Sequence, residues 1–285
     1  QVRPIQAALS DRTGEAELAL YDNAELNRLH VAAGVPPAAA KETVRLSTLD
    51  GLPERLDGRE PAFVKLDAEG EEARIVRGGL RLLDRHSPLV MLEIRSDDAP
   101  SFEAVLALAG LGYAAYRLVP GLGLLAPLDP SEPLDSFQLN LFCCKLDRAQ
   151  ALAARGLLVL PGGLAALATP PEPGNDLHPA LADAVAAGEP QRPAAERLFR
   201  LRRARRRLGL VQLAEPGICR LASLARVARD LGERDLALAA VTRLHGLLDG
   251  PPEPLGEPLL SPEPGFDHVP PGEDVWGWLR QAAAE

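Results

Sequence analysis

The residues best suited to chemistry follow an apolar segment in the first third of the chain. Residues 62–67 are typical of a buried strand that ends in the carboxylate of Asp67, and Glu69 follows in a glycine-containing turn. In an open α/β sheet, ligands bind beyond the carboxyl ends of the strands. We therefore expect Asp67 and Glu69 to face a cleft. Glu71 and Glu72 instead fit a first helical turn, where the helix dipole favours negative charge.

A further carboxylate follows the next apolar run. Residues 89–94 have the continuous hydrophobicity of a strand covered on both faces, interrupted only by Glu93 near its end. Neighbouring parallel strands end at the same edge of a sheet, so we expect Asp67 and Glu93 along one rim. No His or carboxylate spacing in the sequence makes a full metal site, and we predict none. A role for Asp67 in holding a divalent metal stays open as an alternative.

Each of these carboxylates also has a purely structural interpretation. Asp67 could cap the helix that follows it. Glu69 and Glu93 could pair with Arg74 or Arg95 as surface ion pairs, which contribute little to stability. We favour a functional role for Asp67 because strand ends face the cleft in this class of fold. For Glu69 and Glu93 both interpretations stay open.

The elements that must position these carboxylates alternate between strand and helix patterns. The expected strands are residues 2–5, 15–21, 43–46, 62–67, 89–94, 113–119 and 137–145, and the expected helices are residues 73–83 and 100–111. Such alternation predicts a parallel α/β sheet, and right-handed crossovers make it doubly wound. Only a Pro- and Gly-rich connection joins the last two strands, so we expect the final strand to be antiparallel.

The second half of the chain lacks strand patterns. We predict a first domain at residues 1–148, a linker and irregular segment at 149–193, and a helical extension at 194–285. Within the extension, apolar residues recur at helical spacing over residues 218–231 and 236–248. A glycine between these two stripes is a natural helix stop, so the pattern predicts an antiparallel helical hairpin.

Composition limits the classes of protein that fit. The net charge of −9 over 285 residues argues against general nucleic-acid binding, which needs a basic surface. No apolar run reaches the length of a transmembrane segment. Three cysteines do not form a disulfide framework, so we expect buried thiols in a reducing, cytoplasmic environment. The excess of Arg over Lys and the abundance of Ala are compatible with a bacterial source.

An arginine-rich helix is expected at residues 194–208. It could bind RNA or anionic lipid. We favour a helix that docks on the acidic remainder of this chain, because aromatic residues for base stacking are scarce. A scaffold protein whose arginine-rich helix and hairpin engage a protein partner is a further alternative.

The residues described above also resemble a known family. The matching stretches are Ala8 to Asp11 with Gly14 and Leu18, Val44, Thr48 to Asp50, Lys65 to Glu72, Val76 to Gly79 and Leu89 to Ile94. In order and spacing they resemble the FkbM family of S-adenosylmethionine-dependent methyltransferases. The resemblance covers residues 1–145 and implies a partial Rossmann-like, doubly wound class I methyltransferase sheet, followed by an all-α region. Gly79 departs from the family, which usually has Ala there, and glycine within a helix costs about 1 kcal/mol relative to Ala.

The resemblance implies S-adenosylmethionine as the cofactor and a hydroxyl group of a sugar, glycan or natural product as the acceptor. On this basis Asp67 lies near the cofactor's methyl group, as a base or orienting residue. Glu69 and Glu93 would orient the acceptor, and Ala8 and Leu9 would pack near the adenine ring. The alternative is a non-catalytic methyltransferase-like module that keeps the fold and acts as a binding or scaffold protein through its helices.

Two parts of the family pattern do not occur in this sequence. They are the glycine-rich loop that holds the methionine part of the cofactor and the acidic end of the second strand that binds the ribose. The sequence starts at about the third strand, so residues 2–5 would lack a neighbour and residues 62–67 would have an unpaired edge. We therefore expect the natural protein to be longer at its N-terminus.

This pattern gives a direct prediction about affinity. The 285-residue chain alone should not bind S-adenosylmethionine tightly, because the elements that hold the methionine and ribose parts are missing from it. Calorimetric titration of the chain with the cofactor measures this, and micromolar affinity would contradict it.

Overall fold

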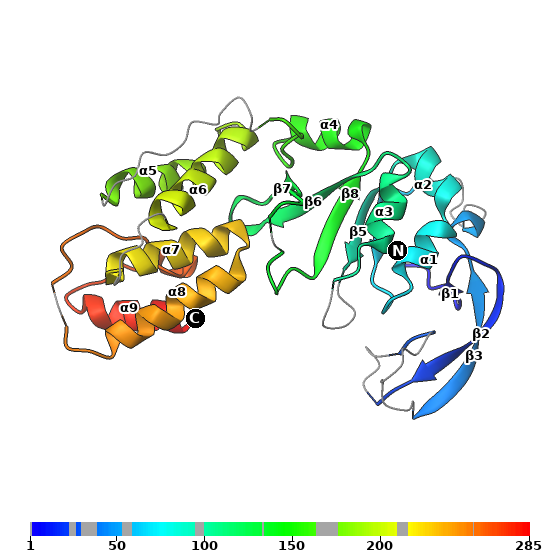
Figure 1. Cartoon of the computed structure of the whole chain (residues 1–285), viewed down its shortest axis with the longest axis horizontal. Helices are drawn as coiled ribbons and strands as arrows, with labels where there is room; N and C mark the ends of the chain where they lie inside the picture. The colour runs from blue at the N-terminus through cyan, green and yellow to red at the C-terminus, as the bar shows by residue number, and fades with distance from the viewer. Residues whose placement is uncertain are drawn as a thin grey trace. The chain divides into compact units, whose positions relative to one another are not determined.

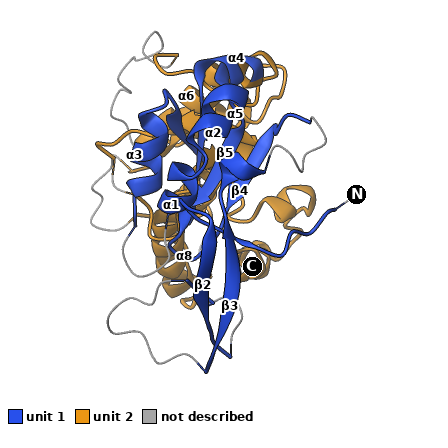
Figure 2. Cartoon of the chain, turned by 90° about the vertical axis from the view of Figure 1, so that its right-hand side faces the viewer, with its two compact units in different colours: residues 1–117, 139–151 blue, residues 118–138, 152–285 orange. Residues whose placement is uncertain are grey.

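The structure is a computed structural model that describes residues 2–22, 27–29, 39–52, 59–94, 100–132, 134–163, 176–209, 216–252 and 254–285. Strands and helices alternate in the first part of the chain, and helices follow (Figure 1). The predicted class, a partial Rossmann-like α/β sheet followed by an all-α region, is confirmed. The chain forms two compact units, residues 1–117 with 139–151 and residues 118–138 with 152–285 (Figure 2). The predicted domain ranges stay predictions.

A three-stranded sheet precedes the larger one. Its strands are β1 (Ala8–Leu9), β2 (Gly14–Leu20) and β3 (Ala40–Ser47), in the order β1-β3-β2. β1 runs parallel to β3, and β2 runs antiparallel to it. The strand predicted at residues 2–5 is wrong, and the first strand begins at Ala8 instead. Pro4 has no backbone N–H to donate, and Val2 is 91% exposed, so this stretch lacks both the bonding and the burial of a strand.

A five-stranded sheet carries the predicted strand ends. Its strands are β4 (Phe63–Leu66), β5 (Leu89–Glu93), β6 (Ala114–Val119), β7 (Leu124–Pro127) and β8 (Asn140–Cys144), in the order β4-β5-β8-β6-β7. β4 and β5 are parallel, whereas β8 is antiparallel to β5 and to β6, so the predicted antiparallel final strand is confirmed. β7 was not expected, because its segment is rich in Pro and Gly.

The burial of β4 differs from the prediction. Among the described residues β4 pairs on one side only, with β5, and it therefore has the unpaired edge expected for residues 62–67. Phe63 is 51% exposed, and only Leu66 of the four strand residues is buried. An apolar run does not distinguish an edge strand from a central one, which is why the sequence overestimated the burial here.

The helix predicted at residues 73–83 is two helices. α1 (Glu72–Arg77) ends at Gly78, and α2 (Leu80–His86) begins after Gly79. A Cβ on Gly78 would lie 2.1 Å from the carbonyl oxygen of Ser10, and one on Gly79 would lie 2.7 Å from the Leu49 side chain. The paired glycines therefore permit a close approach of the chain rather than weakening a continuous helix.

Asp50 fixes the start of α2. Its Oδ1 accepts a hydrogen bond from the backbone N–H of Leu82 at 2.8 Å, and its Oδ2 accepts from Arg81 at 3.1 Å. A carboxylate in this position satisfies backbone donors that the first helical turn leaves unpaired. α3 (Glu103–Ala109) is the remaining helix between β5 and β6, and α4 (Leu146–Ala154) follows β8.

The three cysteines are free thiols and buried, as predicted. Burial raises the pKa of Cys143 to about 12 and that of Cys144 to about 11. The reactive thiolate is therefore strongly disfavoured in both, and these residues act as small hydrophobic side chains of β8.

The second unit is mainly helical. Its helices are α5 (His178–Ala187), α6 (Ala194–Gly209), α7 (Ile218–Leu231), α8 (Arg234–Leu248) and α9 (Val275–Ala284). The predicted hairpin is confirmed as α7 and α8, whose buried residues Leu221, Ala225, Leu244 and Leu248 form one apolar cluster with Trp276 and Leu279 of α9. Within the described residues, no helix combines the length and apolar character needed to cross a membrane.

The irregular segment predicted at residues 149–193 contains regular structure. α4 extends into its start, and α5 lies within it; residues 164–175 are outside the described chain. The proline of residue 179 stands in the first turn of α5, a position that proline favours because the N–H it lacks has no helical partner there. Proline in this stretch therefore marks a helix start, which the sequence interpretation mistook for a linker.

The arginine-rich helix α6 binds acidic side chains of its own unit. Asp183, which is 3% exposed, pairs with Arg203 at 2.6 Å, with Arg200 at 3.3 Å and with Arg207 at 3.7 Å. Arg205 pairs with Glu233 at 2.8 Å. This is the arrangement expected for a helix that docks on the acidic remainder of the chain.

The close approach at Gly78 gives a stability prediction. Gly78→Ala should destabilise the protein by roughly 2 kcal/mol, because the new Cβ would overlap backbone atoms of Ser10. Gly51→Ala is the matched control, since its Cβ would meet neighbours only at ordinary contact distances of 3.4 Å and 3.8 Å. Urea unfolding followed by circular dichroism measures both variants. Equal stability of Gly78→Ala and the unsubstituted chain would show that this approach is not required.

Candidate functional site

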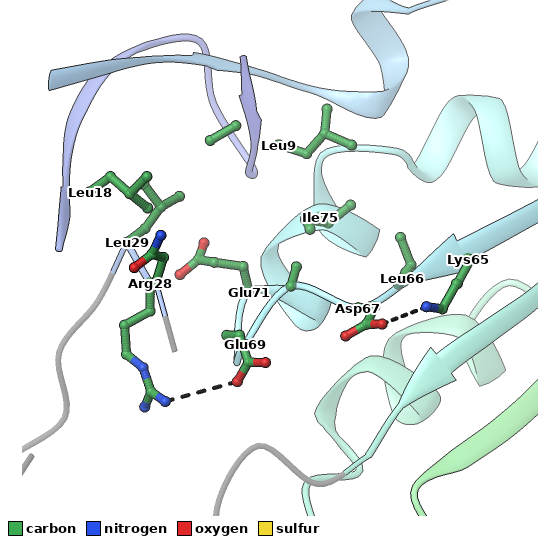
Figure 3. A pocket seen from close by; sticks show the side chains of 13 residues that line it. Leu9, Leu18, Arg28, Leu29, Lys65, Leu66, Asp67, Glu69, Glu71 and Ile75 are labelled. Atoms are coloured by element: carbon green, nitrogen blue, oxygen red, sulfur yellow. Dashed lines mark hydrogen bonds and ion pairs between the residues drawn. The ribbon is translucent and has the colours of Figure 1, made fainter. Parts of the chain in front are cut away.

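A cavity of about 480 Å³ lies in the first unit, at the carboxyl end of β4 (Figure 3). One side is apolar and consists of Ala8, Leu9, Leu18, Leu29, Leu66 and Ile75. The other side is charged and consists of Arg28, Lys65, Asp67, Glu69 and Glu71. The cavity therefore brings together four of the predicted site residues, Ala8, Leu9, Asp67 and Glu69, from segments about 60 positions apart in the sequence.

Glu93, the fifth predicted residue, does not line this cavity but lies beside it. Asp67, Glu69 and Glu93 each place a carboxylate oxygen within 4.8 Å of the others. Asp67 follows the last residue of β4, and Glu93 is the last residue of the parallel neighbour β5, so the expected common rim is present. Oxygen atoms of this kind are what hard divalent cations take as ligands, but acidic groups also cluster without one. The predicted absence of a metal stays a prediction.

The electrostatic environment shifts the pKa values of Asp67 and Glu93 in opposite directions. Lys65 Nζ lies 2.5 Å from Asp67 Oδ2, and this hydrogen bond, followed by one with Glu93, lowers the pKa of Asp67. Burial, followed by the hydrogen bond and the charge of Asp67, raises the pKa of Glu93 to about 7. Near neutral pH, Asp67 is therefore ionised while Glu93 is divided between its two protonation states. Neighbouring carboxyl groups with opposite pKa shifts are suited to different acid–base roles.

The conformation of Glu69 directs its side chain to Arg28. Glu69 has φ of 49°, in the left-handed region that is uncommon for residues other than glycine, and Gly70 follows with φ of 96°. Glu69 Oε2 lies 3.9 Å from Nη2 of Arg28, whose side chain is 7% exposed (Figure 3). The expected alternative partner Arg74 instead binds Glu71 at 3.0 Å. Arg95, the alternative partner of Glu93, is outside the described residues.

Glu71 and Glu72 hold the turn between β4 and α1. The two carboxylate oxygens of Glu72 accept hydrogen bonds from the backbone N–H groups of Ala68 at 2.7 Å and Gly70 at 3.0 Å. Glu71 accepts a hydrogen bond from the hydroxyl of Ser10 at 3.3 Å. Both residues lie where the helix dipole favours negative charge, as expected, and they also bind the loop that carries Glu69.

Residues 2–115 match the family model described as methyltransferase FkbM domain. This segment, called the FkbM segment below, is therefore similar to the methyltransferase FkbM domain. The matched range contains the whole lining of the cavity and also Glu93. No curated protein and no solved structure matches the chain.

Two basic residues of the FkbM segment were missed by the sequence interpretation. Lys65 stands on β4 two positions before Asp67, which directly follows the strand, and residues two positions apart in extended chain point to the same face, so this pair could have been found. Arg28 gave no such signal. It reaches Glu69 because the bridge between Arg28 and Ala19 in the smaller sheet brings it to the cavity, which no local pattern reveals.

The raised pKa of Glu93 in the FkbM segment predicts a pH-dependent stability. Its folded-state pKa of about 7 lies above its usual value of 4.5, so the folded protein holds this proton more tightly. The contribution of Glu93 to stability is thus fully present below pH 4.5 and is lost as the pH rises through 7. Glu93→Gln should remove this contribution and flatten the decline between these two values.

Urea unfolding midpoints at several pH values in that window measure the effect. Glu17→Gln is the control, since it removes an exposed carboxylate of the same unit that does not affect Glu93. A decline in stability that is the same in Glu93→Gln and in the unsubstituted chain would contradict the raised pKa.

Proposed function

We propose that the chain is an S-adenosylmethionine-dependent methyltransferase that methylates a hydroxyl group of a sugar, glycan or natural product. The observation that carries this proposal is the position of Asp67. It follows a strand of the FkbM segment, lines a cavity with Glu69, Ala8 and Leu9, and lies beside Glu93. Carboxylates at strand ends are where ligands bind in sheets of this type.

The cavity residues fit the chemistry of this cofactor. The apolar side suits an adenine ring, and we assign contacts with that ring to Ala8 and Leu9. The charged side has three carboxylates against two basic groups, which suits the positive charge of a sulfonium. When bound, the cofactor supplies an electrophilic methyl group. Asp67 is the residue we place next to that charge.

The proposed roles of the carboxyl groups follow from their pKa shifts. Methyl transfer is an in-line displacement, so placing the hydroxyl oxygen correctly provides much of the rate enhancement. Asp67, kept ionised by Lys65, accepts a hydrogen bond from the acceptor hydroxyl and orients its oxygen. Glu93, with its pKa of about 7, is suited to take up the hydroxyl proton through Asp67. Glu69, held by Arg28, orients the rest of the acceptor.

The alternative of a non-catalytic scaffold has less support. That proposal relies on the arginine-rich helix α6 and on the hairpin of α7 and α8 to engage a protein partner. Arg200, Arg203, Arg205 and Arg207 instead pair with acidic side chains of this chain. A scaffold role would have to use the hairpin or another surface.

Methyl transfer to hydroxyl compounds tests the proposal. The chain is incubated with labelled S-adenosylmethionine at millimolar concentration, because we expect weak cofactor binding, and with a panel of sugars and hydroxylated natural products. Asp67→Asn should reduce the rate by about 100-fold or more, since it removes the ionised group that orients the hydroxyl. Glu17→Gln should leave the rate unchanged. The function is refuted if the unsubstituted chain methylates no hydroxyl compound, and the role of Asp67 is refuted if its variant keeps the full rate.

A further inference from the structure

The second unit contains a cavity of its own, of about 920 Å³. All of its lining residues lie after residue 115, outside the segment that matches the methyltransferase family. The lining comes from several parts of this unit: the 3₁₀ turn Pro120–Leu122, the end of α5, α6, α7, residues 259–271 and α9. Its volume lies in the range typical of small-molecule sites rather than that of a single ion.

The polar wall of this cavity has an excess of negative charge. Arg226 of α7 binds both carboxylate oxygens of Asp267, at 2.7 Å and 2.8 Å, and its Nε donates to Asp230 at 3.1 Å. One guanidinium thus faces two carboxylates. The remaining charged residue of the lining, Glu189, pairs with Arg192 at 2.8 Å. Because the guanidinium is already engaged by this chain's own carboxylates, the wall does not favour an anionic ligand.

Other residues of the lining are aromatic and apolar. The rings of Phe266 and Trp278 are 6.1 Å apart and meet edge to face at 77°. Trp278 donates its indole N–H to the carbonyl oxygen of Val269 at 2.7 Å, which fixes the orientation of the ring. Pro264, Pro270 and Pro271 complete this part of the lining. Aromatic ring faces attract cations, so these rings and the acidic residues favour the same sign of charge.

We propose that the cavity of the second unit binds an organic cation that carries a substituted ammonium group. The alkyl groups of the ammonium contact Phe266 and Trp278, and the carboxylates of Asp230 and Asp267 compensate its charge. Neither the aromatic rings nor the carboxylates alone lead to this inference. It rests on the presence of both in one cavity whose lining has one guanidinium, that of Arg226, which Asp230 and Asp267 already bind. The site is independent of the proposed methyl transfer.

Calorimetric titration of the full chain tests this inference with two probes of nearly the same shape. Choline carries the quaternary ammonium, and 3,3-dimethyl-1-butanol replaces the charged nitrogen by a neutral carbon. Choline should bind about tenfold more tightly than the neutral compound, and its affinity should fall as salt is added. Equal affinities, no binding of choline at millimolar concentration, or tighter binding of a neutral sugar would each overturn the proposal.

Variants locate the site. Phe266→Leu removes an aromatic face, and Asp267→Asn removes a compensating charge; each should weaken choline binding by about tenfold. Asp249→Asn is the matched control, because this exposed carboxylate belongs to the same unit but not to the cavity. Since Asp267 also holds Arg226, its variant is tested for folding by circular dichroism. Full choline affinity in Phe266→Leu overturns the proposal whatever the folding of Asp267→Asn.

Discussion

The parallel pairing of β4 with β5 brings two carboxyl groups to one point, and the chemistry of the first unit depends on it. Two ionised carboxylates at this distance repel each other, so the state in which both are ionised is disfavoured. Lys65 binds Asp67 and favours its ionised form, while Glu93 is partly buried and retains its proton more readily. The pair therefore carries one firmly held negative charge and one exchangeable proton. The hydroxyl acceptor that we propose would be oriented by the held charge of Asp67 and would lose its proton to Glu93 in the fraction of molecules where Glu93 is unprotonated.

The turn after β4 adds a third carboxylate, that of Glu69, to this pair. Glu69 adopts a left-handed backbone conformation, which costs free energy in a residue with a side chain. The hydrogen bonds from Ala68 and Gly70 to Glu72 offset this cost. The turn is also connected to the smaller sheet, where the Ser10 hydroxyl binds Glu71 and the Ser10 carbonyl oxygen approaches Gly78. A substitution at Gly78 would therefore disturb the cavity from the side of the helix, without changing a residue that lines it.

Much of this arrangement could be predicted from sequence, and the exceptions have physical causes. The strand β5 has a continuous apolar run, and the helices α7 and α8 have strong helical periodicity; the structure contains all three where these patterns indicate. The break at Gly78 and Gly79 was missed because it arises from contacts with Ser10 and Leu49, which are remote in sequence. α5 was missed because proline occurs both in linkers and at helix starts. The common rim of Asp67 and Glu93 followed from the ends of neighbouring strands, whereas the contact of Glu69 with Arg28 required the tertiary structure.

The two cavities share one electrostatic feature although only the first belongs to the FkbM segment. In each, acidic lining residues outnumber basic ones, and the basic groups are bound by carboxylates of the same unit: Lys65 and Arg28 in the first, Arg226 in the second. An anion would have to displace an existing ion pair in either cavity, and in the second cavity Asp230 and Asp267 share the single guanidinium of Arg226. The net charge of −9 argues against a general affinity for nucleic acid, and the acidic lining of the two cavities favours small cationic ligands. The sulfonium that we propose for the first cavity and the ammonium that we propose for the second carry the same sign of charge.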